Sequence, residues 1–212
     1  MAADIPFDQS LSGVAFTSHR NTLVVQASSG PVRLWDLTDL RHPVPIEDRR
    51  FDADTEDARF IDNHTLAAST GNDNKVRLWD LTDPRHAALL SGLASENGVE
   101  HLQTSPDEKT VAGVTGSGEL HIWDVTNPRD PSDVGTIPDI SAQGVEFGHD
   151  GYTAAVATSS PPGFAVDSTG VLLFDLDPDR LYRYLCSING QPITADQWKQ
   201  LVPDHPYQEP CR

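Results

Sequence analysis

Residues 76–86 read VRLWDLTDPRH, and near-copies of this stretch stand on both sides of it. The earlier copy is VRLWDLTDLRH at 32–42, and the later ones are LHIWDVTNPR at 120–129 and a degenerate VLLFDL at 171–176. Trp35, Trp79 and Trp123 are 44 residues apart in each step, and Phe174 follows after 51. Four short strands with their turns use roughly 40–45 residues, so this period predicts one four-stranded sheet in each repeat.

The composition is that of a soluble protein, with 37% apolar residues and no apolar run long enough to cross a bilayer. The first eight residues lack the basic and apolar blocks of a signal peptide, which predicts a cytoplasmic location for the isolated chain. An extracellular location would follow if the chain belongs to a longer membrane-tethered protein. The net charge of −17 repels phosphate backbones and acidic membrane surfaces. We therefore expect neither nucleic acid nor a membrane as a partner.

The residues around each repeat predict which strand each segment forms. A second anchor stands 19 residues before each tryptophan, and the apolar runs that follow it are expected second strands: 22–25, 65–68, 110–113 and 153–156. These runs do not alternate, as expected where neighbouring sheets cover both faces. Turn residues separate them from third strands that carry the Trp-Asp pair. Outer strands are expected near 44–46, 87–91 and 134–137.

The Val-Arg-Leu-Trp-Asp copies resemble the repeats of bacterial WD-repeat proteins over roughly residues 5–176. This resemblance implies an all-β fold, a β-propeller of about four WD-type four-stranded blades, either alone or as part of a larger ring, with a short α-helical tail. Its blade anchors would be Trp35, Asp36, Trp79, Asp80, Trp123, Asp124, Phe174 and Asp175. The Thr-Asp-Pro-Arg endings are similar to those in large proteins of high-GC Gram-positive bacteria, where the propeller is joined to a signalling NTPase or regulatory domain.

After residue 176 the pattern changes, so we expect repeats at 1–176 and a helical tail at 177–212. Asp177 and Pro178 predict the start of one helix, and a capping box predicts a second helix over 195–201. The tail segment around 186–194 also resembles that of the same bacterial proteins. Cys186 and Cys211, the two cysteines of the chain, are expected to form a disulfide that staples the tail. The alternative is two separate thiols in a reducing cytoplasm.

Residues Ile5–Phe7 stand where an outer strand stands in later repeats. In a closed ring of four blades this segment would pair with Val171–Leu176. In a longer parent protein, which we favour because WD-type blades are shaped for a ring wider than four units, it would complete a preceding blade. An open array leaves faces uncovered, and self-association through open blade faces is then expected.

The fourth repeat carries extra residues between its second and third strands, at 159–168. On the loop face of a propeller this segment would be a recognition loop for a protein or peptide partner, and the alternative is a tolerated insertion. The candidate contact residues of this partner loop are Pro161, Pro162, Phe164 and Asp167.

Catalytic motifs are missing from the sequence, with no phosphate-binding loop, nucleophile elbow or zinc spacing, so we predict no cofactor and no enzyme. His42 and His86 occupy the same place in successive repeats, too far apart to bind one metal ion. We favour a non-catalytic interaction scaffold or sensor module in a signalling or regulatory assembly. The alternatives are a non-functional or partial C-terminal fragment of a longer multidomain WD-repeat NTPase, and a propeller hydrolase or lyase.

Overall fold

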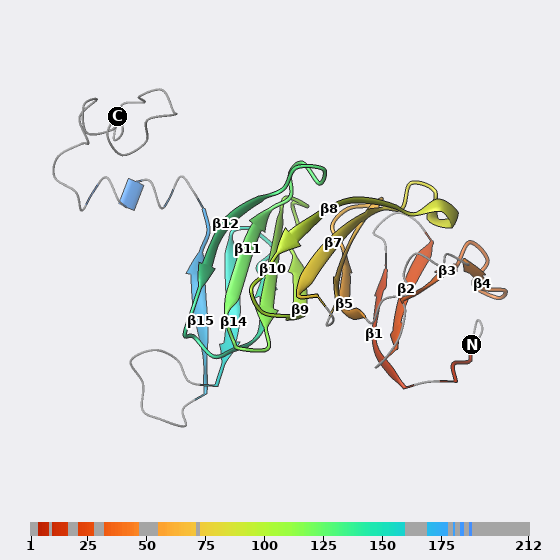
Figure 1. The fold of residues 1–212 in the computed structure, drawn as a ribbon, viewed down its shortest axis with the longest axis horizontal. Coiled ribbons are helices and arrows are strands. Elements are labelled where there is room, and N and C mark those ends of the chain that lie inside the picture. The colour runs from red at the N-terminus through yellow and green to blue at the C-terminus, as the bar shows by residue number, and fades with distance from the viewer. Residues whose placement is uncertain are drawn as a thin grey trace. The chain divides into compact units, whose positions relative to one another are not determined.

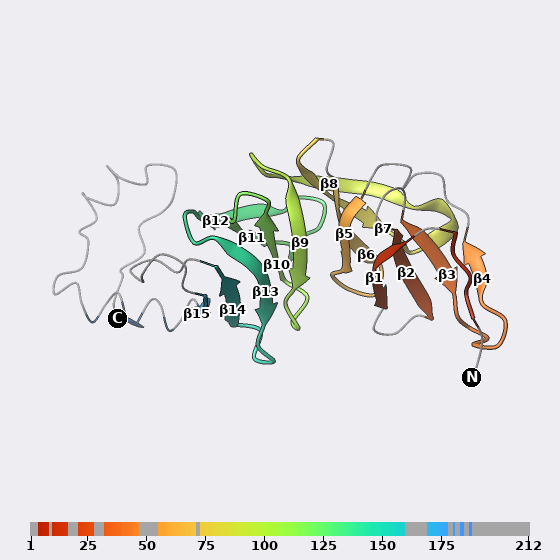
Figure 2. The same ribbon diagram turned by 90° about the horizontal axis from the view of Figure 1, so that it is seen from below.

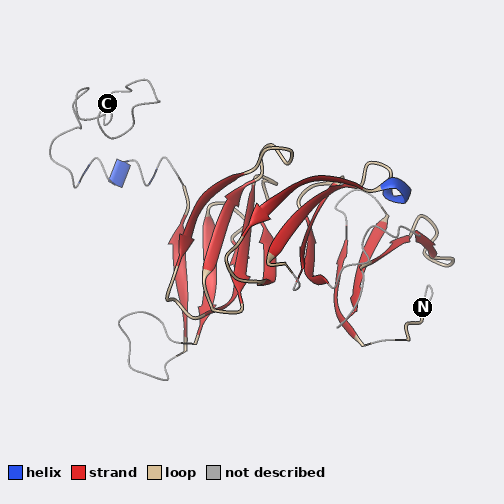
Figure 3. Ribbon diagram, viewed as in Figure 1, coloured by secondary structure: helices blue, strands red, loops and turns tan. Residues whose placement is uncertain are grey.

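The computed structural model describes residues 4–8, 10–16, 21–27, 32–46, 55–70, 73–159 and 169–177, together with 180, 183, 184 and 187. The chain divides into two compact units, Met1–Leu173 and Phe174–Arg212. Almost all regular structure in the described residues is strand (Figure 1; Figure 3). The four isolated positions of the second unit have helical backbone, whereas the expected helix over 195–201 lies outside the described residues.

Four antiparallel sheets follow one another along the chain, and in each the strands are ordered as in the sequence. The first contains β1 (Leu11–Phe16), β2 (Thr22–Ala27), β3 (Arg33–Asp36) and β4 (Val44–Ile46). The second contains β5 (Thr55–Phe60), β6 (Thr65–Thr70), β7 (Lys75–Asp80) and β8 (Ala88–Ala94), with a short 3-10 helix, η2 (Pro84–His86), before β8. The third contains β9 (Val99–Thr104), β10 (Thr110–Thr115), β11 (Leu120–Asp124) and β12 (Ser132–Ile137).

The fourth sheet has three strands in the described residues: β13 (Ala142–Phe147), β14 (Thr153–Thr158) and β15 (Gly170–Asp175). The predicted second, third and outer strands of the first three repeats are thereby confirmed as strands. The less favoured arrangement, in which Ile5–Phe7 pairs with Val171–Leu176, is not found, because β15 is the last described strand of its sheet and residues 4–8 lie outside any strand. Apolar contacts hold that segment on the first sheet instead.

Residues with positive φ lie between the second and third strands of the second and third sheets. Asn74 has φ 54° and Gly118 has φ 81°, and both conformations are accessible to these residue types. At Gly118 a Cβ would also lie 2.8 Å from the Cα of Ser141, so the position accepts only glycine without a shift of the backbone. These turns fix the register of the β6–β7 and β10–β11 hairpins.

The core lies between successive sheets, so the second and third sheets each have one face toward the preceding sheet and one toward the following sheet. The first strands of successive sheets pack side by side (Figure 2). Between the first and second sheets the core contains Val24, Val32, Leu34, Ala58, Leu66, Ala68, Leu81 and Ala87. Between the second and third it contains Ile61, Ala67, Val76, Leu78, Leu93, Val99, Leu102, Val111, Trp123 and Val125.

The burial of the second strands shows whether a sheet is covered on one face or on both. β2 and β6 are buried at all six positions, as predicted for strands covered on both faces. β14 alternates instead, with Ala154, Val156 and Thr158 buried and Ala155 and Ala157 more accessible. One face of the fourth sheet therefore lacks a covering layer among the described residues.

Candidate functional site

The aspartates of the Trp-Asp pairs cap turns. Asp36, Asp80 and Asp124 each accept a hydrogen bond from the backbone N–H of the threonine two residues on, at 2.8 Å in all three cases. The side-chain hydroxyl of that threonine, and then its N–H, lowers the pKa of each carboxyl below its ordinary value. Asp175 likewise accepts from the N–H of Asp177 at 3.0 Å. These carboxylates therefore accept hydrogen bonds within the turns that directly follow them.

The repeated histidines have a local partner as well. Nδ1 of His42 lies 2.8 Å from Oδ2 of Asp39, and Nδ1 of His86 lies 2.7 Å from Oδ2 of Asp83. The first cause of the lowered pKa of each aspartate is this histidine. No group of three or more potential metal ligands occurs among the described residues. The Asp-x-x-His pattern recurs because both repeats form the same turn with the same Asp–His contact.

The three repeat tryptophans, Trp35, Trp79 and Trp123, all stand in third strands, but their environments differ. Trp123 is 2% exposed and stacks on His121 with ring centroids 5.4 Å apart. Trp79 and Trp35 are only partly buried. The indole N–H of Trp35 is buried without a hydrogen-bond partner, and the ring is covered by Phe7 at a centroid distance of 6.0 Å. Of these three tryptophans, only Trp123 is fully buried.

A buried carboxylate that the sequence did not reveal joins three sheets. Asp57 on β5 is 4% exposed, and its Oδ2 accepts from the N–H of Leu102 on β9 at 2.8 Å. Its Oδ1 accepts from Nε2 of Gln26 on β2 at 3.1 Å and from Nη1 of Arg59 at 2.5 Å. Glycine and histidine stand 44 residues before and after Asp57, so repeat comparison alone gives no signal for it. The carboxylate stabilises the packing of the inner strands.

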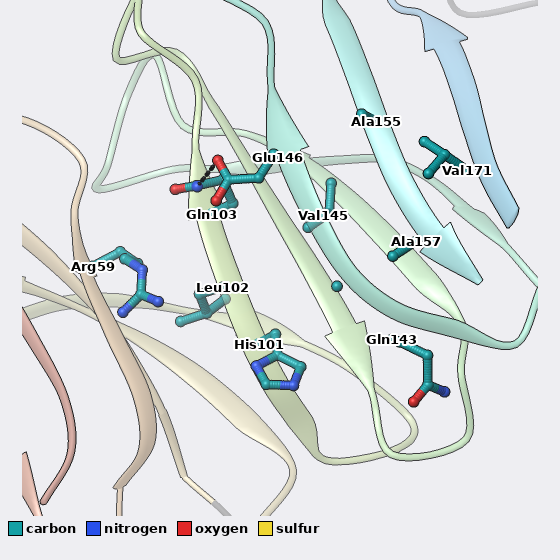
Figure 4. Close-up of a pocket in the computed structure, with 11 residues that line it drawn as sticks. Arg59, His101, Leu102, Gln103, Gln143, Val145, Glu146, Ala155, Ala157 and Val171 are labelled. Atoms are coloured by element: carbon teal, nitrogen blue, oxygen red, sulfur yellow. Dashed lines mark hydrogen bonds between the residues drawn. The ribbon is translucent and has the colours of Figure 1, made fainter. Parts of the chain in front are cut away.

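A cleft of about 470 Å³ opens beside these inner strands (Figure 4). Its polar wall comes from β5, β9 and β13, where Nε2 of Gln103 donates to Oε2 of Glu146 at 2.5 Å. Its aliphatic wall comes from the fourth sheet and includes Ala155, Ala157 and Val171. The cleft thus combines hydrogen-bonding groups with an apolar surface, a mixture typical of binding sites.

The apolar wall continues across the open face of the last sheet, defined here as Ala155, Ala157, Val171 and Leu173. Val171 is 65% exposed and Leu173 is 73% exposed. The residues at the same distances before the tryptophan in the other repeats are all buried: Val32, Leu34, Val76, Leu78, Leu120 and Ile122. The local sequence is nearly unchanged, so the exposure arises because no sheet covers this face in the described structure.

The first sheet has the complementary exposed surface, on the face that a preceding sheet would cover. Val14 is 58% exposed, and Phe16 is also exposed, whereas the corresponding Ala58 and Leu102 of the next two sheets are buried. Ile5 and Phe7 cover only part of this face, over Leu23, Val25 and Leu37. Arg33 supports Phe7, with its guanidinium 5.8 Å from the ring centroid.

Six predicted site residues lie outside the described residues: Cys186, Cys211, Pro161, Pro162, Phe164 and Asp167. The disulfide and the recognition loop therefore stay predictions. No helix in the described part of the chain is both long and apolar enough to cross a membrane. A scan against protein-family models finds no match for the sequence. A search of curated proteins finds no similar protein either.

Proposed function

We propose that this chain is a WD-type β-propeller module, complete or partial, that binds a protein partner through the open face of the last sheet and the adjoining cleft. The observation that carries this proposal is the exposure of Val171 and Leu173 at repeat positions that are buried in each of the other three sheets. Contiguous exposed aliphatic side chains, rimmed by polar groups such as Gln103 and Glu146, are characteristic of protein-interaction surfaces.

The strand order of the fourth sheet supports the same surface. β15 has no neighbour on its outer side among the described strands, whereas β3, β7 and β11 are each followed by a fourth strand. An edge strand presents unpaired backbone N–H and C=O groups that can accept a strand from a partner. The open face would supply apolar contact area and the edge would supply backbone hydrogen bonds.

The chemistry of the described side chains favours binding over catalysis. The repeat aspartates and histidines are committed to turns, and Asp57 is committed to donors on three sheets. The wider role, as a scaffold or sensor in a signalling or regulatory assembly, rests on the resemblance of the repeats to those of bacterial signalling proteins.

Site-specific photo-crosslinking tests the proposed surface. A photo-reactive benzoylphenylalanine in place of Leu173 should yield a discrete protein adduct in the cells that produce this chain. The same group in place of Val134, which is 63% exposed on the outer strand β12, is the matched control and should yield none. Val171→Asp should abolish the adduct formed from position 173. Equal adducts from both positions, or none from position 173, would overturn the proposal.

A further inference from the structure

We infer that the partner on the open face is the first sheet of a second copy of this chain, bound head to tail. This inference rests on the proposed function, because it names the occupant of the same surface. The exposed face of the first sheet and the open face of the last sheet are complementary, because inside the chain faces of these two kinds pack against each other. The junctions inside the chain show what normally covers each face.

The junctions between the first and second sheets and between the second and third sheets are built from the same two kinds of face. At the junction between the second and third sheets, the earlier sheet contributes aliphatic residues that precede its tryptophan, Val76 and Leu78, and its second-strand residue Ala67. The later sheet contributes its tryptophan face, with Trp123 and the inner-strand residue Leu102. The junction between the first and second sheets repeats this pattern with Val32 and Leu34 against Ala58, and with Trp79 packed on the same core.

The first and last sheets have these same faces, and no sheet covers them in the described part of the chain. Val171, Leu173 and Ala155 on the last sheet stand at the repeat positions of Val76, Leu78 and Ala67. Val14 on the first sheet stands at the position of Leu102, and Trp35 at that of Trp123. A second copy placed head to tail would therefore form a junction of the type already present twice within the chain, with aliphatic residues packed on a tryptophan face.

The segment around Ile5 supplies an additional match. Ile5 stands 30 residues before Trp35. Leu93, on the outer strand β8 of the preceding sheet, likewise stands 30 residues before Trp123. Leu93 packs in the core beside Trp123, and Ile5 packs on the cluster beside Trp35. Residues 5–7 thus occupy the place of an outer strand of a preceding sheet, but they form no β-sheet hydrogen bonds with a neighbouring strand. The last sheet of a second copy has the opposite deficit, because no described strand lies beside β15 on its outer side.

The contact is heterologous, because a different surface of each copy is used. This property gives the inference a discriminating test. A contact between two identical open faces would depend on the last sheet only. A head-to-tail contact requires the first sheet of one copy and the last sheet of the other.

Analytical ultracentrifugation of the full chain is the experiment. The unmodified protein should sediment at no less than twice the 23.1 kDa of one chain. Val14→Asp and Leu173→Asp should each weaken association by at least about 100-fold, because an unpaired carboxylate would be buried in an apolar junction. Both residues are exposed in the single chain, so each variant should fold, with an unchanged circular dichroism spectrum. Val134→Asp is the control and should associate like the unmodified protein.

Mixing the two variants completes the test. Val14→Asp retains an intact last sheet and Leu173→Asp retains an intact first sheet, so an equimolar mixture should form a one-to-one dimer and nothing larger. A mixture that stays monomeric, or a Val14→Asp variant that associates normally by itself, would overturn the head-to-tail contact. A crosslinked adduct at position 173 that contains another protein and not this chain would also overturn it, while leaving the proposed binding surface supported.

Discussion

The junction between the second and third sheets and the open face of the last sheet are built from nearly the same local sequence, yet one is buried and the other is exposed. Leu78 and Leu173 both directly precede the aromatic anchor of their repeat. Leu78 is fully buried against the third sheet, whereas Leu173 is 73% exposed. The difference shows that burial in a repeat array depends on whether a neighbouring unit is present, as well as on the pattern of the strand itself.

The largest expected effect concerns the tryptophans on the two kinds of face. Trp123→Ala should lower the free energy of unfolding by about 3–5 kcal/mol, because a large aromatic side chain is removed from a closed junction. Trp35→Ala should cost clearly less, because among the described residues Ile5 and Phe7 cover its ring in place of a whole sheet. Urea denaturation of both variants measures the difference. Equal losses would mean that the short segment covers Trp35 as well as a sheet does.

A second comparison uses the repeat-equivalent leucines. Leu78→Ala should destabilise the chain by about 2–5 kcal/mol, the range for truncating a fully buried leucine. Leu173→Ala should change the free energy of unfolding by less than about 0.5 kcal/mol when the protein is dilute enough to be monomeric. Chemical denaturation at low protein concentration gives both values. A large loss at position 173 under those conditions would show that another part of the same chain covers the open face.

Two glycines allow a comparison of sites at which a methyl group is added. A Cβ at Gly113 would lie 2.7 Å from Cζ3 of Trp123 and 3.0 Å from Cγ1 of Val99, so Gly113→Ala should cost about 1–3 kcal/mol through overpacking. Gly144 on β13 has no heavy atom within 4 Å of such a Cβ. Gly144→Ala should therefore be neutral to within about 0.5 kcal/mol. Thermal unfolding of both variants tests whether the closed junction at Gly113 is packed more tightly than the cleft that Gly144 lines.

The sequence was sufficient to predict the strands but not the coverage of the faces. The 44-residue period and the apolar second strands placed β2, β6, β10 and β14 correctly, because both signals are local and recur in each repeat. Outer strands were also placed by the same spacing. The exposure of Val171 and Leu173 could not be predicted in this way, because their residue types match those of covered repeats.

The polar network around Asp57 was missed for a related reason. Its partners Gln26 and Leu102 come from two other sheets and lie 31 and 45 residues away. No repeat copy of the aspartate marks the position, and an acidic residue beside Glu56 resembles part of an exposed edge. The aspartates of the Trp-Asp pairs have partners two residues away, so their turn role is accessible to sequence reasoning.

The smallest expected effect tests stabilisation that stays within one sheet and should not depend on a neighbouring sheet. Asp73, in the turn between β6 and β7, is paired with Arg77 and accepts from Oγ1 of Thr70 at 2.5 Å, and these contacts lower its pKa from 3.8 to about 2. The unfolded chain therefore binds the proton more readily, so the contribution is complete above about pH 4 and is lost as the pH falls through 2. Because both side chains are partly exposed, we expect at most about 1 kcal/mol. Asp73→Asn should show that loss at pH 7, and the difference from the unmodified protein should shrink between pH 4 and 2. A carboxyl resonance of Asp73 that titrates near pH 4 in an NMR experiment would contradict this prediction.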